Sequence, residues 1–250
     1  MMEVEHYTSA TLARFYDAFN ESEHDWLFYQ SQLGETSLDV LDVGCGTGSW
    51  PLRLAAGGHR VMAIDPAEAM VQCARAKDAG QTVQWHVGEL SFVPPEPMFD
   101  LVTMTGHAFQ CLQTDSDIAA TLSGVRERLR PAGRLMFETR NPLRRAWRHW
   151  TPMVTRREVM LPDGQRLAHW NRFVEQIGQL IRFEDHYQLL PAGRHWVSES
   201  QLRFLSQPRL AEHLALAGFG KIDWYGDWQG GAFDPQSSGE IIVVAHAPAR

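Results

Sequence analysis

The chain has 250 residues, 44% of them hydrophobic and 21% charged, a composition that excludes fibrous and intrinsically disordered proteins. This length allows one α/β domain with an insertion. The formal net charge of −7, from 23 basic and 30 acidic side chains, argues against a surface built to neutralise the phosphates of a nucleic acid.

Residues 1–37 carry aromatic side chains at spacings that suit one or two amphipathic helices. We therefore expect an N-terminal helical cap on the main domain. From residue 38 the pattern changes. Residues 38–43 form a short apolar run that ends at Gly44, as expected of a buried parallel strand.

Strands and helices are predicted to alternate over the next hundred residues. Short apolar runs at residues 59–64, 82–87, 99–104 and 134–138 predict four more strands. Asp65 and Pro66 are expected to be the N-cap and first-turn proline of an Ala-rich helix that continues through residue 79. Thr114 and Asp117 have the spacing of a capping box at the start of another helix. Such alternation predicts a doubly wound, mostly parallel sheet with helices on both faces.

After residue 140 the alternation stops. Four segments separated by Gly- and Pro-containing turns, at residues 153–161, 165–177, 179–189 and 194–205, predict an antiparallel β meander. A helix from residue 206 and strands at residues 221–225 and 240–246 complete the chain. The expected organisation is a main domain of residues 38–140 and 207–250, with residues 141–206 inserted as an antiparallel β lid over the substrate.

The segment Asp42-Val-Gly-Cys-Gly-Thr-Gly48 stands where the first strand must turn into a helix. Its glycines allow the backbone to approach a ligand, and the following helix N-terminus offers free N–H groups. Nucleotide-binding dehydrogenases use Gly-x-Gly-x-x-Gly here, but Ser49 occupies the position of the third glycine of that pattern. Asp65 follows Gly44 by 21 residues, at the place where a carboxylate accepts hydrogen bonds from two ribose hydroxyls.

These residues resemble the first motif of the class I S-adenosylmethionine-dependent methyltransferases. Gly88-Glu89 after the third strand, Phe99-Asp-Leu-Val102 in the fourth and residues 129–135 before the fifth are similar to later motifs of that family in order and spacing. The resemblance covers about residues 38–140 and 207–247. It implies a seven-stranded Rossmann-like methyltransferase fold, with S-adenosylmethionine as cofactor.

The resemblance also implies which residues bind the cofactor. The glycine motif would line its methionine part, and Asp65 would hold the ribose. Met70 and Leu90 would contact the adenine faces and Glu89 the adenine amino group, although the family more often has Asp there. Tyr7 and Tyr16 would help to close the pocket. The residues expected at the cofactor are Tyr16, Asp42, Gly44, Cys45 (by its backbone), Gly46, Gly48, Asp65, Pro66, Met70, Gly88, Glu89, Leu90 and Thr105.

The loops after the fourth and fifth strands are expected to face the acceptor, because ligands bind beyond the carboxyl ends of parallel strands. His107 is the candidate general base or substrate contact. A loop histidine that is bonded to the backbone or packed beside the cofactor is the alternative. Arg140 and Asn141 are candidates to orient an anionic or amide group of the acceptor.

The predicted function is methyl transfer from S-adenosylmethionine, by in-line displacement, to an O or N atom of a small-molecule acceptor. Two alternatives stay open: an RNA or protein methyltransferase that uses the seven arginines of residues 140–166, and a cofactor-binding module without turnover. Six of the nine tryptophans lie beyond residue 140, which suits an aromatic acceptor pocket or anchoring of the meander.

The remaining features predict absences. No apolar stretch approaches the roughly 20 residues of a membrane span, and the acidic, polar start of the chain has no signal-peptide character. The three cysteines are far apart, and the histidines lack metal-ligand spacing. We expect a cytoplasmic protein with no metal, no membrane contact and no nucleic-acid partner. The sequence makes no prediction of the oligomeric state.

Overall fold

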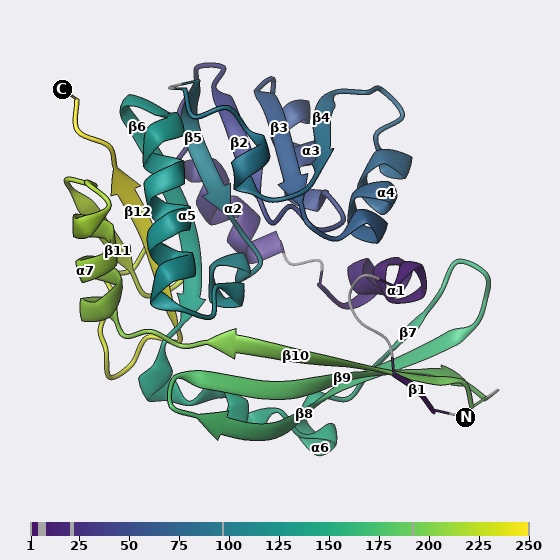
Figure 1. Ribbon diagram of the computed structural model, residues 1–250. Coiled ribbons are helices and arrows are strands. Elements are labelled where there is room, and N and C mark those ends of the chain that lie inside the picture. The colour runs from purple at the N-terminus through teal and green to yellow at the C-terminus, as the bar shows by residue number, and fades with distance from the viewer. Residues whose placement is uncertain (1, 5–8, 21–22, 97, 192, 250) are drawn as a thin grey trace.

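The computed structural model describes residues 2–4, 9–20, 23–96, 98–191 and 193–249. Two sheets dominate the architecture. A large sheet with helices on both faces forms one part, and a smaller, mostly antiparallel sheet lies beyond the end of it (Figure 1). The predicted fold class is therefore confirmed.

The large sheet has seven strands and is parallel except at one edge. The chain winds outward in opposite directions from β2 and β5, so the carboxyl ends of these neighbours form the topological switch point at which open α/β sheets bind ligands. Its order is β11 (Ile222–Tyr225), β12 (Glu240–His246), β6 (Leu129–Arg140), β5 (Phe99–Met104), β2 (Asp39–Val43), β3 (Arg60–Asp65) and β4 (Val83–Val87).

Helices cover both faces of this sheet because successive residues of a strand point to opposite sides. On β5, Leu101 belongs to one apolar core and Val102 to the other. The first core packs against α2 (Glu23–Ser31) and α3 (Ser49–Ala56), and the second against α5 (Asp115–Arg128) and α7 (Gln207–Leu216). Burial on both faces explains the continuous apolar runs of the central strands.

The structure confirms one predicted helix start and contradicts another. The capping box of α5 is confirmed, since Thr114 and Asp117 bond each other's backbone amides. The prediction for α4 (Glu68–Lys77) was wrong at both ends, because its N-cap is Ala67 and it stops before residue 79. Asp65 instead ends β3, and its carboxylate accepts a hydrogen bond from the backbone N–H of Ala67 at 2.8 Å.

The small sheet has five strands, in the order β1 (Met2–Val4), β10 (His195–Arg203), β9 (Leu180–Leu190), β8 (Arg166–Ile177) and β7 (Arg157–Met160). Strands β7 to β10 form the predicted meander. Its predicted first strand is wrong in its first half, where α6 (Pro152–Thr155) forms with a proline in its first turn. Strand β1 adds to β10 in parallel, so the first residues are not purely a helical cap.

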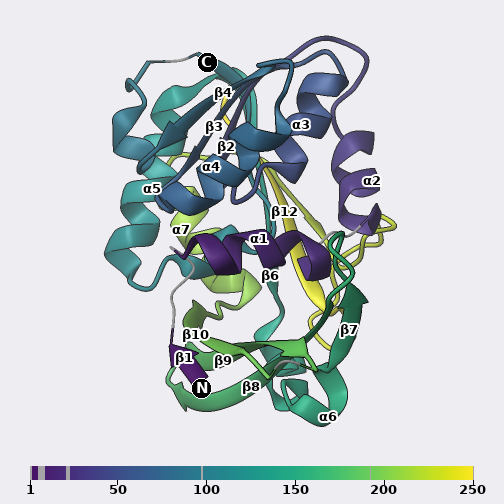
Figure 2. The same cartoon turned by 90° about the vertical axis from the view of Figure 1, so that its right-hand side faces the viewer.

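Helix α1 (Ala10–Asn20) lies between the two sheets (Figure 2). Leu12, Phe15 and Phe19, spaced by three and four residues, pack against Leu167, Tyr187 and Trp196 of the small sheet. Ala13, on the other side of α1, packs against Met70 of α4. The helix thus joins the small sheet to the large one.

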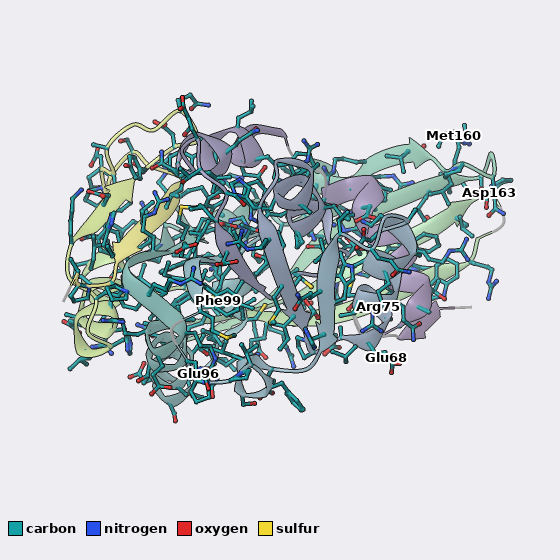
Figure 3. The ribbon with its side chains drawn as sticks, turned by 90° about the horizontal axis from the view of Figure 1, so that it is seen from above. Glu68, Arg75, Glu96, Phe99, Met160 and Asp163 are labelled. Atoms are coloured by element: carbon teal, nitrogen blue, oxygen red, sulfur yellow. The ribbon has the colours of Figure 1, made fainter. Side chains whose placement is uncertain are left out.

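The β7–β8 hairpin, with Met160 and Asp163 at its end, projects to one side of the molecule (Figure 3). No helix in the described ranges is long and apolar enough to cross a membrane.

Short 3-10 helices connect several of these elements. They are η1 (Leu90–Phe92), η2 (Ala108–Cys111), η3 (Pro142–Arg144) and η4 (Ala146–His149). The division into a main domain of residues 38–140 and 207–250 with an inserted lid stays a prediction.

Candidate functional site

The glycine-rich loop after β2 is held by its own backbone and by Asp65. The amides of Gly44 and Cys45 donate to the carbonyl of Ile64 at 2.8 and 3.1 Å. The amide of Gly46 donates to Oδ2 of Asp65 at 2.8 Å. Burial of the carboxyl group raises the pKa of Asp65 despite the two backbone N–H groups bonded to it. The loop and the carboxylate therefore form one preorganised unit at the switch point.

The three glycines of the loop have positive φ angles of 78°, 52° and 81°, but they serve different purposes. A Cβ at Gly44 would lie 2.8 Å from Cβ of Ala108, and one at Gly48 would lie 2.5 Å from the Trp85 ring. Protein packing thus requires glycine at both positions. A Cβ at Gly46 would meet nothing within 4 Å, so this residue borders open space that a ligand can enter.

Asp42 lies beneath this loop and is only 1% exposed. Its Oδ1 accepts a hydrogen bond from the Thr103 hydroxyl at 2.5 Å, whereas its buried Oδ2 has no partner among the described residues. Burial raises the pKa of Asp42 to about 7. A buried acceptor without a donor is costly, and a ligand or bound water beside the loop would satisfy it.

The residues predicted at the adenine do not all share one environment. The backbone of Gly88 donates to the carbonyl of Asp65 at 2.9 Å, which places the segment after β4 beside the end of β3. Met70 is buried against α1, Leu90 is half-buried, and Glu89 is exposed. Pro66 is exposed, and half-buried Thr105 accepts a hydrogen bond from the amide of Ala108 through its carbonyl.

Helix α1 closes over the glycine loop. Its Asp17 accepts a hydrogen bond from the Thr47 hydroxyl and forms an ion pair with Lys77 of α4 at 2.8 Å. Tyr16, the neighbour of Asp17, is half-buried. Burial is the main cause that raises the pKa of Tyr16 to about 12, and the carboxylates of Asp185 and Asp65 raise it further. The Tyr16 hydroxyl is therefore within electrostatic reach of Asp65 beside the glycine loop and of Asp185 in the small sheet; Tyr7 lies outside the described residues.

His107 stands in the loop after β5 with a left-handed backbone, and Ala108 beside it packs on Gly44. The imidazole Nε2 donates to Glu240 of β12 at 3.1 Å, and the backbone amide donates to Glu138 of β6 at 2.6 Å. Although burial raises it, the hydrogen bond from His107 and the charges of His107 and Arg140 hold the pKa of Glu240 below its usual value. The histidine is thus oriented by carboxylates at the carboxyl edge of the sheet.

Glu138 is the buried end of this network. Its carboxylate also accepts a hydrogen bond from the hydroxyl of Tyr29, a fully buried residue of α2. Burial raises the pKa of both groups, that of Tyr29 well above its usual value. The sequence did not predict Tyr29, Glu138 and Glu240 as site residues, because they meet only when α2, β6 and β12 pack together. One signal was available: Glu138 is an acidic residue inside the apolar strand β6.

Arg140 and Asn141 at the end of β6 have different roles. Arg140 donates to Gln110 Oε1 at 3.0 Å, and burial lowers the pKa of Arg140 while Glu240, Glu138 and Asp185 oppose that shift. Both amide hydrogens of Asn141 are used by the carbonyls of Pro235 and Ser238, each at 2.9 Å. The expectation that Asn141 orients the acceptor is therefore corrected: it holds the loop before β12.

The tryptophans beyond residue 140 do not form one aromatic pocket. Trp147 and Trp150 pack against Phe204 and Phe183, Trp196 packs against α1, and Trp224 and Trp228 belong to opposite cores of the large sheet. They anchor structural elements separately. The arginines of residues 140–166 are likewise dispersed, with Arg157 bonded to the Phe19 carbonyl and Arg166 paired with Glu158. Within the described ranges no cluster of three or more His, Cys, Asp or Glu residues could hold a metal ion.

Comparison with known proteins agrees with this geometry. Residues 40–133 match a family model described as a methyltransferase domain. A putative methyltransferase of Geobacillus sp. (strain WCH70) is 32% identical over 140 residues, which cover 52% of this chain and 57% of that protein. The chain spans about half the length of the curated relatives it matches.

Solved structures match over almost the whole chain. The CcbJ methyltransferase of Streptomyces caelestis has a TM-score of 0.76 at 20% identity and covers 98% of this chain and 99% of its own. The SAM-bound amino pentose methyltransferase CalS10 of Micromonospora echinaspora has a TM-score of 0.69 at 22% identity, with coverage of 95% and 97%. At these identities the likeness shows a shared fold, including the small sheet.

Proposed function

We propose that the chain is a class I S-adenosylmethionine-dependent methyltransferase that transfers a methyl group to an oxygen or nitrogen atom of a small-molecule acceptor. One observation carries this proposal. The glycine loop with Asp65 and the His107 loop flank the same switch point, where Ala108 packs on Gly44. A cofactor site and a candidate base are thereby adjacent.

The residues present fit S-adenosylmethionine. Gly46 borders open space, Asp42 has a buried acceptor without a donor, and Asp65 is held by two backbone amides. We assign Gly46 and Asp42 to the methionine part and Asp65 to the ribose. When bound, the cofactor supplies an electrophilic methyl group on a sulfonium sulfur. The buried thiol of Cys45 is not a nucleophile here, because burial raises its pKa far above the usual range.

The acceptor requires orientation and the removal of a proton. Alignment alone supplies up to roughly 7–11 kcal/mol for well-oriented reactants. We assign Tyr16 and Arg140, which both lie within electrostatic reach of Asp185, to the acceptor side of the site. His107 lies between two carboxylates, with its Nε2 3.1 Å from Glu240 and its Nδ1 4.0 Å from the buried Glu138. We assign it as the base that takes the proton from the acceptor. Glu240 then stabilises the imidazolium.

Several observations favour a small acceptor over RNA or protein. Helix α1 and the small sheet lie over the carboxyl edge of the large sheet, and Asp185 and Asp65 place negative charge beside Tyr16. Arg140, Arg157 and Arg166 bond within the chain, and Trp147 is buried, so these members of the stretch are not free for stacking on nucleic-acid bases. CalS10, which shares the fold, is described as an amino pentose methyltransferase.

Label transfer tests the proposal. Purified protein is incubated with methyl-deuterated S-adenosylmethionine and a whole-cell lysate, and the small-molecule, RNA and protein fractions are then separated and analysed by mass spectrometry. We expect the label in the small-molecule fraction, and its loss in the Asp65→Ala variant. Label in RNA or protein would support the first alternative, and cofactor binding without any label would support a binding module; either result contradicts the proposal.

A further inference from the structure

The inner face of the small sheet, which faces α1, carries one row of polar residues. Asn171 on β8 and Ser198 on β10 are both direct partners of Asp185 on β9. Direct partners in an antiparallel pair share a face, and so do residues two apart on one strand. Tyr187 and Trp196, two residues from Asp185 and Ser198, pack against Phe15 of α1. The row Asn171–Asp185–Ser198, here called the polar row, therefore faces the large sheet.

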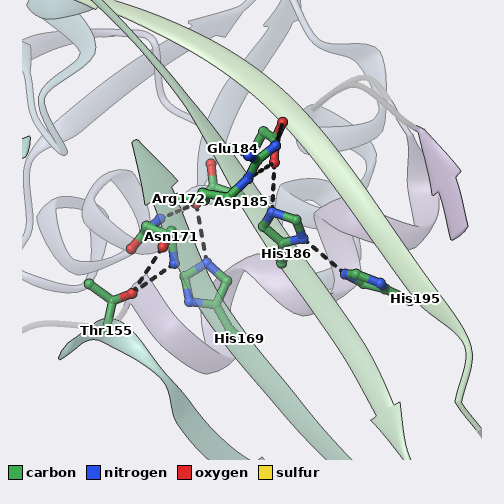
Figure 4. A network of polar contacts seen from close by, with 8 residues as sticks. All are labelled: Thr155, His169, Asn171, Arg172, Glu184, Asp185, His186 and His195. Carbon is green, nitrogen blue, oxygen red and sulfur yellow. Dashed lines mark hydrogen bonds and ion pairs between the residues drawn. The ribbon is translucent and has the colours of Figure 1, made fainter. Parts of the chain in front are cut away.

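Asp185 and Ser198 of the polar row are buried, and Asn171 is half-buried. Asp185 is 4% exposed, and its Oδ1 accepts hydrogen bonds from Asn171 Nδ2 at 2.5 Å and His169 Nε2 at 3.2 Å (Figure 4). Ser198 is 0% exposed, and its hydroxyl has no partner among the described residues. The buried Nδ1 of His169 has none either. A buried hydroxyl without a partner is costly unless another molecule supplies one.

The outer face of the same strands offers a contrast. Glu184 next to Asp185 forms an ion pair with Arg172 and a 2.8 Å hydrogen bond with His186 (Figure 4). His186 is in turn within 3.0 Å of His195. The side chains of the outer network bond one another, whereas the Ser198 hydroxyl of the inner row has no partner in the part of the chain that the structure describes.

Tyr16 of α1 and Arg140 of β6 both lie within electrostatic reach of the polar row. The carboxylate of Asp185 acts on the Tyr16 hydroxyl, which Asp65 also influences, and on the Arg140 guanidinium. Cys111 in the His107 loop is exposed to solvent, yet its pKa is raised by the surrounding protein and by Asp65. Strand β10, which carries Ser198, also packs against η2 of the His107 loop, where the Gln110 side chain donates to the carbonyl of Arg203 at 3.1 Å.

We propose that the polar row binds a hydrogen-bond donor of the methyl acceptor, an ammonium or a hydroxyl group, and so helps to select the acceptor. This inference rests on the proposed function, because it places the acceptor between the polar row and the cofactor loop. The Asp185 carboxylate and the Ser198 hydroxyl accept the donor, and the Asn171 amide keeps the carboxylate in place. Ser198 gains a partner that it lacks among the described residues.

Three probes separate the two kinds of donor. Protein saturated with S-adenosylhomocysteine is titrated with D-glucosamine, D-glucose and cyclohexylamine to tens of millimolar. Binding is followed by ¹⁵N NMR of the backbone amides and the Asn171 side-chain amide. We expect at least one probe to shift the Asn171 and Ser198 signals. An ammonium site favours the two amines, and a hydroxyl site favours the two sugars.

Ser198→Ala is the most informative variant, because the removed hydroxyl has no partner among the described residues, so we expect the variant to be at least as stable as wild type. We expect it to weaken the bound probe by about 3- to 10-fold. Asp185→Asn should weaken an ammonium probe by at least about 10-fold and a hydroxyl probe less. Glu199→Gln is the matched control, since this exposed carboxylate lies beside Ser198 on the opposite face.

Two results would overturn the inference: none of the probes shifts the polar row, or Ser198→Ala binds the probe as tightly as wild type. Affinity for S-adenosylhomocysteine is measured on the same samples. If that affinity is absent, the proposed function fails, and the probes are then titrated into the ligand-free protein, so the two failures are distinguishable.

Discussion

The carboxylate of Asp65 accepts a hydrogen bond from the backbone amide of Gly46 across an N–O distance of 2.8 Å. Its other oxygen accepts one from Ala67 at the same distance. The end of β3 therefore holds the glycine loop of β2 in place before any ligand arrives. Preorganisation of this kind reduces the conformational entropy that binding must overcome.

Replacement of the loop glycines by alanine should separate ligand effects from folding effects. Gly46→Ala places a methyl group in open space at a φ of 52°, so we expect a modest loss of stability of about 1–2 kcal/mol and at least about 10-fold weaker binding of S-adenosylhomocysteine. Gly48→Ala should instead destabilise the protein strongly, because its Cβ would lie 2.5 Å from the Trp85 ring. Urea unfolding and calorimetric titration check both; unchanged affinity of Gly46→Ala would refute its assignment.

His107 should matter for turnover rather than for cofactor binding. With an acceptor found by label transfer, we expect His107→Asn to lower kcat by roughly 10²-fold or more and Glu240→Gln by a smaller factor, at unchanged affinity for S-adenosylhomocysteine. His246→Asn is the control, because His246 also donates to a carboxylate, Asp223 at 2.9 Å, but from the opposite end of β12. A normal kcat for His107→Asn would favour the alternative of a structural loop histidine.

Asp42 should give the stability of the protein a distinct pH dependence. Burial raises the pKa of Asp42 from 3.8 to about 7, so folding takes up a proton between these values and stability falls as the pH rises through this range. The stability gained by Asp42→Asn should therefore be greater at pH 8 than at pH 5, by up to about 3 kcal/mol. Urea unfolding at both pH values measures it. A gain that does not change with pH would contradict the burial of an ionisable Asp42.

The sequence predicted those parts of the fold that depend on local patterns. The capping box at Thr114, the strand ending at Gly44 and the meander turns are all encoded within a few residues. Strand β1 could not be predicted, because its partner β10 lies almost 200 residues away. The contacts of His107 with Glu138 and Glu240 could not be predicted either, because they also join segments that are distant in the sequence. Asn141 was misassigned because its amide is used by a loop that no local pattern links to it.

The assignment of the glycine loop and Asp65 as the cofactor site is tested most directly by calorimetric titration of S-adenosylhomocysteine into the wild-type protein and the Asp65→Ala variant. We predict one binding site per chain in wild type and at least about 10-fold weaker binding in the variant, because each hydrogen bond to a charged group contributes roughly 1.5–3 kcal/mol. Circular dichroism should show the same fold for both. No binding to wild type, or equal affinity in the two proteins, would contradict a cofactor site at Asp65.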